Sequence, residues 1–283
     1  MKIITTVSET HSEMNKVKEL GKKIVIVPTM GYLHDGHLSL LNHAKELGDV
    51  VISTLFVNPK QFGPNEDYDK YPRDFERDRN LLEKTGCDYL FYPEVSEMYG
   101  EHFSTQISLG GITKILEGVT RPTHYDGVAL IVLKLFNITK CDVGIFGQKD
   151  YQQFMVIQKM VNDLNLDIQL VMAPIIRENN GLAMSSRNRF LSQEEFTQAA
   201  ILNKSLIAAK EKILGGMRKR NEINKFITKS LLTSSLIKID YVETVIDFTF
   251  VLMDEFHSGD RIVILLACWF GTTRLIDNII IQL

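Results

Sequence analysis

The stretch Pro28-Thr29-Met30-Gly31-Tyr32-Leu33-His34-Asp35-Gly36-His37 separates an apolar run at 24–27 from an amphipathic run at 38–47. This order predicts a buried strand, a turn and a helix. The first turn of a helix presents free N–H groups and the positive end of the helix dipole. The stretch therefore predicts an anion-binding turn, and a nucleotide phosphate is the favoured ligand.

Two glycines and two histidines support this interpretation. Gly31 and Gly36 allow the backbone to approach a ligand closely, and His34 and His37 add donors whose charge can change near neutral pH. Zinc is an alternative ligand, because the two histidines could share a helix face. However, His43 lies on a different side of the helix, and the chain has no CxxC or HExxH pattern. We therefore favour phosphate over a metal and expect no protein-held metal.

Composition limits the class of protein. The chain has 283 residues, 45% hydrophobic residues and a net charge of −3, which predicts a folded protein and gives no electrostatic case for nucleic acid. Cys87, Cys141 and Cys268 are far apart and odd in number, which is typical of reduced, buried thiols. The N-terminus lacks a signal-peptide pattern, and the apolar run at 262–270 is too short to span a bilayer. We expect a cytoplasmic protein without membrane or nucleic-acid partners.

Apolar runs alternate with helical patterns over the first 175 residues, which predicts an α/β fold with a Rossmann-like parallel sheet. The expected strands lie at 24–28, 50–57, 87–92, 105–109 (an edge strand), 143–146 and 168–174. We expect Pro72 to open one of the intervening helices. The remainder, 176–283, predicts a smaller α+β domain with helices at 193–214 and 221–235 and strands at 237–245, 261–270 and 275–281.

Ligands of parallel sheets bind outside the carboxyl ends of the strands, so the loops at these ends hold the candidate residues. Asn58 and Gln61 follow the second strand and carry neutral amides that can donate and accept. Arg121 lies in a loop that feeds a helix. It could offset anionic charge at the site, but capping and packing explain its segment equally well.

A second strand-to-helix turn follows the strand at 143–146. Gly147 permits close approach, Lys149 supplies a cation for phosphate, and Asp150 can accept from ribose hydroxyls. Gln153 lies on the same helix face as Asp150, one turn further on.

A third candidate segment, at 175–188, contains two hydroxyls beside an arginine. Ser185, Ser186 and Arg187 suit phosphate oxygens, which arginine binds with two parallel hydrogen bonds.

Together these segments resemble the pantoate–β-alanine ligases, a family of the HxGH nucleotidylyltransferase superfamily. The match extends over essentially the whole chain and rests on the segments at 28–37, 56–73, 116–128, 147–153, 177–188 and 274–278. The chain departs from the usual family pattern at Lys60, Thr123, Tyr125, Gln148 and Asn180.

The resemblance implies ATP-dependent condensation of pantoate with β-alanine through a pantoyl-adenylate, with Mg²⁺ bridging phosphate oxygens, in a homodimer whose C-terminal domain is a lid. It implies that His37, His34 and Lys149 are catalytic and that Asn58, Gln61 and Gln153 bind pantoate or β-alanine. The implied ATP-binding residues are Met30, Gly31, Tyr32, Leu33, His34, Asp35, Gly36, His37, Gly147, Gln148, Lys149, Asp150, Ile176, Met184, Ser185, Ser186 and Arg187.

Two other functions are compatible with the phosphate turns alone. One is a different HxGH nucleotidylyltransferase that acts on a phosphate ester, but the neutral amides of Gln61 and Gln153 suit a hydroxy acid better. The other is a non-catalytic nucleotide sensor or an RNA-binding relative of class I synthetases. The acidic net charge and the absence of an anticodon-type domain argue against it.

Overall fold

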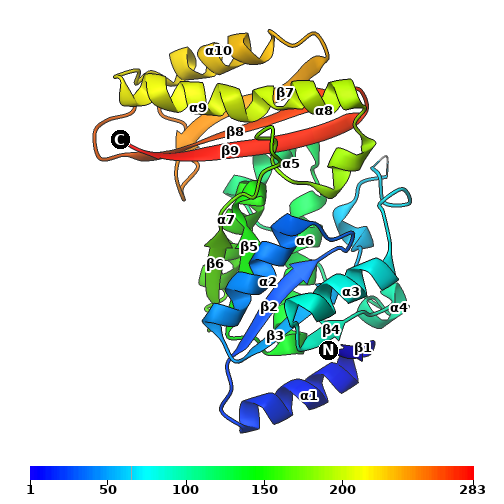
Figure 1. Cartoon of the computed structure of the whole chain (residues 1–283). Coiled ribbons are helices and arrows are strands. Elements are labelled where there is room, and N and C mark those ends of the chain that lie inside the picture. The colour runs from blue at the N-terminus through cyan, green and yellow to red at the C-terminus, as the bar shows by residue number, and fades with distance from the viewer. Residues whose placement is uncertain (65) are drawn as a thin grey trace. The chain divides into compact units, whose positions relative to one another are not determined.

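The computed structural model describes residues 1–64 and 66–283 (Figure 1). The chain forms two compact units. The first contains Met1–Gln148 and Gln152–Pro174, and the second contains Lys149–Tyr151 and Ile175–Leu283. The predicted roles of the two parts, an ATP- and pantoate-binding domain at 1–175 and a lid at 176–283, stay predictions.

The first unit is built on a six-stranded sheet in which all pairs are parallel, as predicted. Its strand order is β1-β4-β3-β2-β5-β6. Strands β2, β3 and β4 follow one another toward one edge of the sheet, and β5 and β6 follow one another toward the other edge. The direction of the strand order therefore reverses between β2 and β5, which is the topological switch point of the sheet. The strands are β1 (Lys2–Ile4), β2 (Ile24–Thr29), β3 (Val50–Leu55), β4 (Tyr89–Phe91), β5 (Val143–Gly147) and β6 (Gln169–Ala173).

Alternate residues of the central strands pack on opposite faces of this sheet. Val25 and Val27 of β2 belong to the same buried cluster as Leu41 of α2 and Leu82 of α3. Helices α1 and α6 pack against each other and against β2. The helices of this unit are α1 (Val7–Glu19), α2 (Asp35–Leu47), α3 (Phe75–Thr85), α4 (Val95–Met98), α5 (Glu117–Thr120), α6 (His124–Thr139) and α7 (Tyr151–Asp163), with short 3₁₀ turns η1 (Pro59–Gln61), η2 (Gly111–Lys114) and η3 (Gln148–Asp150).

Several predicted elements are wrong in detail. The segment 105–109 forms no strand, and the edge of the sheet is instead β1, which pairs with β4. Helix α3 begins at Phe75, not at Pro72, because the Asp74 side chain accepts the N–H of Arg77 and caps it. The single helix predicted at 193–214 is two helices, α8 (Gln193–Ala199) and α9 (Ile201–Leu214).

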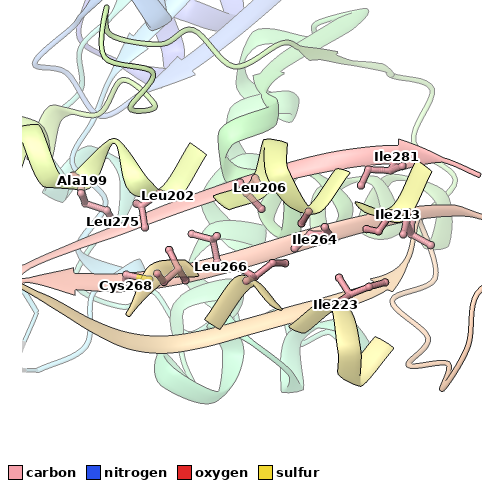
Figure 2. Packing of buried hydrophobic residues seen from close by; sticks show 14 of the residues in the cluster. Ala199, Leu202, Leu206, Ile213, Ile223, Ile264, Leu266, Cys268, Leu275 and Ile281 are labelled. Atoms are coloured by element: carbon pink, nitrogen blue, oxygen red, sulfur yellow. The ribbon is translucent and has the colours of Figure 1, made fainter. Parts of the chain in front are cut away.

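The second unit is a three-stranded antiparallel sheet with helices packed on it, in agreement with the predicted α+β domain. Its order is β7-β8-β9. Every second residue of β8, including Ile264 and Leu266, packs against α9 residues such as Leu202 and Leu206 (Figure 2). The remaining elements are β7 (Ile237–Ile246), β8 (Arg261–Phe270), β9 (Thr273–Gln282), α10 (Arg220–Leu231) and the 3₁₀ turn η4 (Ser186–Phe190).

The three cysteines are free and buried, as predicted. Burial raises the pKa of Cys87, Cys141 and Cys268 to about 12. Among the described residues, no helix is long and apolar enough to cross a membrane.

We predict that the native protein resists thiol reagents. At pH 8 a thiol with a pKa of about 12 is ionised in about one molecule in ten thousand, and the thiolate is the reactive form. A colorimetric disulfide reagent should therefore react slowly with the native protein and promptly with three thiols in guanidinium. Stoichiometric reaction of any cysteine in the native protein within minutes would contradict this.

Candidate active site

The turn between β2 and α2, which the sequence predicts to bind an anion, leads directly into the first turn of a helix. Helix α2 begins at Asp35, and His34 is its N-cap. The backbone N–H of His34 donates to Nδ1 of His37 at 3.3 Å, and the two rings lie 4.1 Å apart between centroids. Since Nδ1 accepts, a neutral His37 ring carries its hydrogen on Nε2. His37 can therefore donate a hydrogen bond to an anion through Nε2.

A buried carboxylate holds the backbone of this turn. Oδ2 of Asp78 accepts the N–H of Tyr32 at 2.6 Å, and Oδ1 accepts the N–H of Leu33 at 2.8 Å. These bonds fix two residues with left-handed φ, Gly31 at 87° and Tyr32 at 50°. A Cβ atom at Gly31 would lie 3.1 Å from Asp78 Oδ2. The absence of a side chain at Gly31 therefore also allows the Asp78 carboxylate to lie close to the backbone of the turn.

The neighbouring arginine completes this arrangement. Arg77 donates to the carbonyl of Leu33 at 2.7 Å, and its guanidinium lies 4.8 Å from the centre of the Tyr32 ring. Asp78 is 2% exposed, and this burial raises the pKa of its carboxyl, whereas the N–H groups of Leu33 and Tyr32 lower it. The pattern of the sequence did not indicate Asp78 as a site residue.

Beside the turn, the side chain of Gln61 is held at both ends of its amide. Its Oε1 accepts from Asn58 Nδ2 at 3.1 Å, and its Nε2 lies 3.1 Å from Met30 Sδ. Asn58 is 1% exposed, and its Oδ1 accepts from the Tyr99 hydroxyl at 2.7 Å. Two backbone groups determine which way the Asn58 amide points, because its Nδ2 also donates to the carbonyl of Gly127 and its Oδ1 accepts the N–H of Lys60. Gln61 therefore presents its N–H₂ group toward Met30.

The backbone of Gln61 is held by a charged network. His124 Nδ1 lies 2.9 Å from the Gln61 carbonyl, and Arg121 Nη1 lies 3.1 Å from His124 Nε2. Arginine can only donate, so Nε2 accepts and Nδ1–H donates to Gln61. Arg121 also pairs with Glu66, with Nη2 at 2.5 Å from Oε2. Its charge is thus balanced within the protein, which supports the packing interpretation of this arginine.

Gly127 allows helix α6 to lie against this segment. A Cβ atom there would be 2.2 Å from the carbonyl oxygen of Lys60 and 2.6 Å from Cα of Gln61, far inside contact distance. The helix can therefore approach Gln61 only because residue 127 has no side chain.

The two glutamines at the start of α7 differ in their contacts. Gln152 is 3% exposed, accepts the N–H of Glu117 and donates to the carbonyls of Ile112 and Ile115. Gln153 is half-buried and makes no side-chain hydrogen bond with the residues that the structure describes. Gln152 thus holds the backbone of the segment 112–117 in place. The Gln153 amide remains available to a ligand.

The second predicted turn leaves the carboxyl end of β5, the neighbour of β2. Gly147 is the last residue of β5, and η3 spans Gln148–Asp150. A Cβ atom at Gly147 would meet nothing within 4 Å, so close packing does not require this glycine. Lys149 and Asp150 belong to the second unit, and Nζ of Lys149 lies 3.6 Å from Oδ1 of Asp150.

The third segment also lies in the second unit. The N–H of Met184 donates to the carbonyl of Ile176 at 2.9 Å, which closes a turn around Gly181 at φ 93°. Ser185 caps η4 by accepting the N–H of Arg187 at 3.3 Å. Ser186 and Arg187 follow in the first turn of η4.

Comparison with known proteins identifies the family. The family model described as Pantoate-beta-alanine ligase matches residues 2–280. The chain belongs to this family.

Relatives in the pantoate-beta-alanine ligase family are similar over their full length. Pantothenate synthetases of Caldicellulosiruptor bescii and Acetivibrio thermocellus are 50% and 48% identical over 282 residues, with 100% of this chain and 99% and 100% of theirs covered. The crystal structure of pantothenate synthetase from Thermus thermophilus superimposes with a TM-score of 0.92 at 40% identity and 99% coverage of both chains. A Francisella tularensis pantoate-beta-alanine ligase, described as complexed with Beta-gamma ATP and Beta-alanine, gives 0.78 at 34% identity, with 99% of this chain and 97% of that chain covered.

Two departures from the usual family pattern have structural explanations. Asn180 Nδ2 donates to the carbonyl of Phe196 at 3.0 Å, which the oxygen of an ionised aspartate could not do. Lys60 is exposed, so a long charged side chain is tolerated there, and its Nζ lies 5.8 Å from the centre of the Tyr99 ring.

We predict that Asp78→Asn destabilises this ligase. An asparagine has one acceptor where the turn needs two, so a buried N–H of Tyr32 or Leu33 loses its partner. The expected loss is about 1–3 kcal/mol of unfolding free energy in urea. The control is Asp163→Asn, which removes an exposed partner of Lys159 and should cost less than about 1 kcal/mol. Equal stability of the two variants would contradict the role given to Asp78.

Proposed function

We propose that this chain joins pantoate to β-alanine in two steps, of which the first consumes ATP. A pantoate carboxylate oxygen attacks the α-phosphorus of ATP, a P–O bond forms, and pyrophosphate leaves. The amine of β-alanine then attacks the acyl carbon of the pantoyl-adenylate, loses a proton, and AMP leaves. The products are pantothenate, AMP and pyrophosphate.

One observation carries this proposal. The amide N–H₂ of Gln61 lies against Met30, within the turn that bears His34 and His37. A neutral donor beside an anion site suits an uncharged hydroxyl or a single carboxylate better than a second phosphate. This argues against a nucleotidylyltransferase that acts on a phosphate ester. The ligand-bound Francisella relative, described with an ATP compound and β-alanine, is consistent with the same substrates here.

The chemical difficulty is the approach of a carboxylate to a polyanion. Catalysis therefore requires donors and cations that hold the two substrates and offset the growing charge. We assign this role to His37 through Nε2–H, to His34 beside it, and to Lys149 and Arg187. Closure of the second unit as a lid would keep water from the acyl-adenylate.

The remaining contacts divide between the substrates. We assign pantoate to Gln61 and Gln153, and we propose that Asn58 acts by orienting the Gln61 amide. We assign ATP to the backbone and side chains of the three glycine- or serine-containing segments, which comprise Met30, Gly31, Tyr32, Leu33, His34, Asp35, Gly36, His37, Gly147, Gln148, Lys149, Asp150, Ile176, Met184, Ser185, Ser186 and Arg187.

Mg²⁺ is proposed to arrive with ATP. Within residues 1–64 and 66–283 no group of three or more His, Cys, Asp or Glu side chains is placed to hold a metal ion. We propose that phosphate oxygens of ATP would supply most of the ligands of this ion, which would neutralise charge on ATP. We further propose a homodimer in the cytoplasm.

The direct test is product formation. Purified protein with ATP, Mg²⁺, pantoate and β-alanine should release AMP and pantothenate in equal amounts. Omission of β-alanine should leave exchange of labelled pyrophosphate into ATP that depends on pantoate. Absence of both reactions would overturn the proposal.

We predict that His37→Ala retains its fold and loses about 100- to 1000-fold in the rate of adenylate formation, the usual effect of one positioned donor. Pyrophosphate exchange measures this step alone. His43→Ala, on the same helix but outside the turn, is the matched control and should keep its rate. A His37→Ala variant with a near-normal rate would remove His37 from the mechanism.

We predict that Gln61→Ala and Gln153→Ala raise the KM for pantoate by about 10-fold, because each loses a hydrogen bond of about 1 kcal/mol or more. The KM for ATP should change by less than about twofold, since neither amide is assigned to ATP. Gln158→Ala, on the same helix as Gln153, is the control. Equal increases in both KM values would show that the amides do not discriminate between the substrates.

A further inference from the structure

The closing segment of the chain, Arg274-Leu275-Ile276-Asp277-Asn278, matches the family pattern but has no role in the site described above. Asp277 and Asn278 lie next to each other on β9, and each is 2% exposed. Neighbouring residues of a strand point to opposite faces of the sheet. The two polar side chains therefore reach different partners, and both partners belong to segments assigned to ATP.

Asp277 holds the segment that carries Ser185 and Arg187. Its carboxylate accepts two hydrogen bonds from Arg177, at 2.7 Å from Nη1 and 3.0 Å from Nη2. Arg177 Nη1 also donates to the carbonyl of Gly181 at 3.1 Å. The ion pair thus fixes the turn from which the serines and Arg187 extend.

Asn278 holds the turn that carries Lys149. Its Nδ2 donates to the carbonyl of Lys149 at 3.0 Å. Two residues further along, the ring of Tyr151 stacks on Phe250 with centroids 6.0 Å apart and planes at 20°. Both contacts join the segment Lys149–Tyr151 to other residues of the second unit.

We propose that Asp277 and Asn278 are positioning residues that hold the Lys149 turn and the Ser185–Arg187 segment in one fixed frame. The inference rests on the proposed assignment of these two segments to ATP. Strand β9 can hold both segments rigidly, because it is paired with β8 along its whole length. The paired residues run from Arg261 opposite Gln282 to Phe270 opposite Thr273. If Lys149 and Arg187 act on one triphosphate, the distance between their charged groups must stay constant. A displacement of a catalytic group by about 1 Å can lower the rate by about 100-fold.

The first test compares two asparagines of the same unit. Asn278→Ala removes the hydrogen bond to Lys149, whereas the control Asn224→Ala removes a bond to Glu243 that is remote in sequence from both ATP segments. We expect Asn278→Ala to lower kcat/KM for ATP by about 10-fold, with the KM for pantoate changed by less than about twofold. Amide hydrogen exchange should accelerate at 147–153 and not at 177–188.

The second test concerns the ion pair. Asp277→Asn should lower kcat/KM for ATP by at least about 10-fold and accelerate exchange at 177–188. Glu243→Gln weakens the ion pair with Arg220 in the same unit and is the matched control. Arg177→Lys is a milder variant that keeps the charge and loses the bidentate geometry, and it should show the same effect in smaller measure.

The variants distinguish positioning from general stability. A purely structural role would lower the melting temperature of Asp277→Asn and Glu243→Gln alike and leave kcat/KM for ATP equal in the two folded variants. That result, or unchanged ATP kinetics in both Asn278→Ala and Arg177→Lys, would overturn the inference. Failure of the wild-type protein to form pantothenate would instead refute the proposed function, and the exchange measurements would still show whether β9 holds the two segments.

Discussion

Parallel pairing is the constraint on which the candidate site depends. It brings the carboxyl ends of all the strands to one edge of the sheet, so the turns after β2 and β5 leave neighbouring strands. The pairing of Val25 with Val143 in β2 and β5 joins positions that are far apart in sequence. The loop after β3, which carries Gln61, reaches the same edge because β3 is the other neighbour of β2. The strand order alone therefore places these segments at one edge of the sheet.

The sheet places the loops, and buried polar side chains from other segments fix their conformation. Asp78 of α3 satisfies two N–H groups of the β2–α2 turn, and Gln152 of α7 satisfies three backbone groups of the segment from η2 to the start of α5. A buried polar group without a partner costs several times what a typical hydrogen bond contributes. These segments can thus keep irregular conformations, including the left-handed Tyr32, because buried side chains pair with these backbone groups.

Local patterns correctly predicted the sheet, the strand-to-helix turns after β2 and β5, and the α+β unit, because strand and helix periodicity and turn glycines act over a few residues. Phosphate binding at these turns stays a prediction. Local patterns failed at β1, which has three residues and no alternation, and at 105–109, where strand-forming residues have no neighbouring strand to pair with. They also missed Asp78 and Tyr99, whose partners lie 46 and 41 residues away. Contacts of that range are set by tertiary packing, which one sequence does not display.

The buried and half-buried amides of η1 and α7 show why residue type alone does not identify a ligand contact. Gln152 and Gln153 are adjacent, yet a helix turns them about 100° apart, so one faces backbone groups and the other does not. Asn58 and Gln61 are both buried amides, but fixed backbone partners occupy Asn58 on both sides and leave Gln61 with an N–H₂ group beside Met30. A neutral amide can recognise a substrate only if its own orientation is fixed, because its two ends offer opposite hydrogen-bonding character. Under the proposed assignment of pantoate to Gln61, selectivity for this hydroxy acid would depend on the residues that orient Gln61 as much as on Gln61 itself.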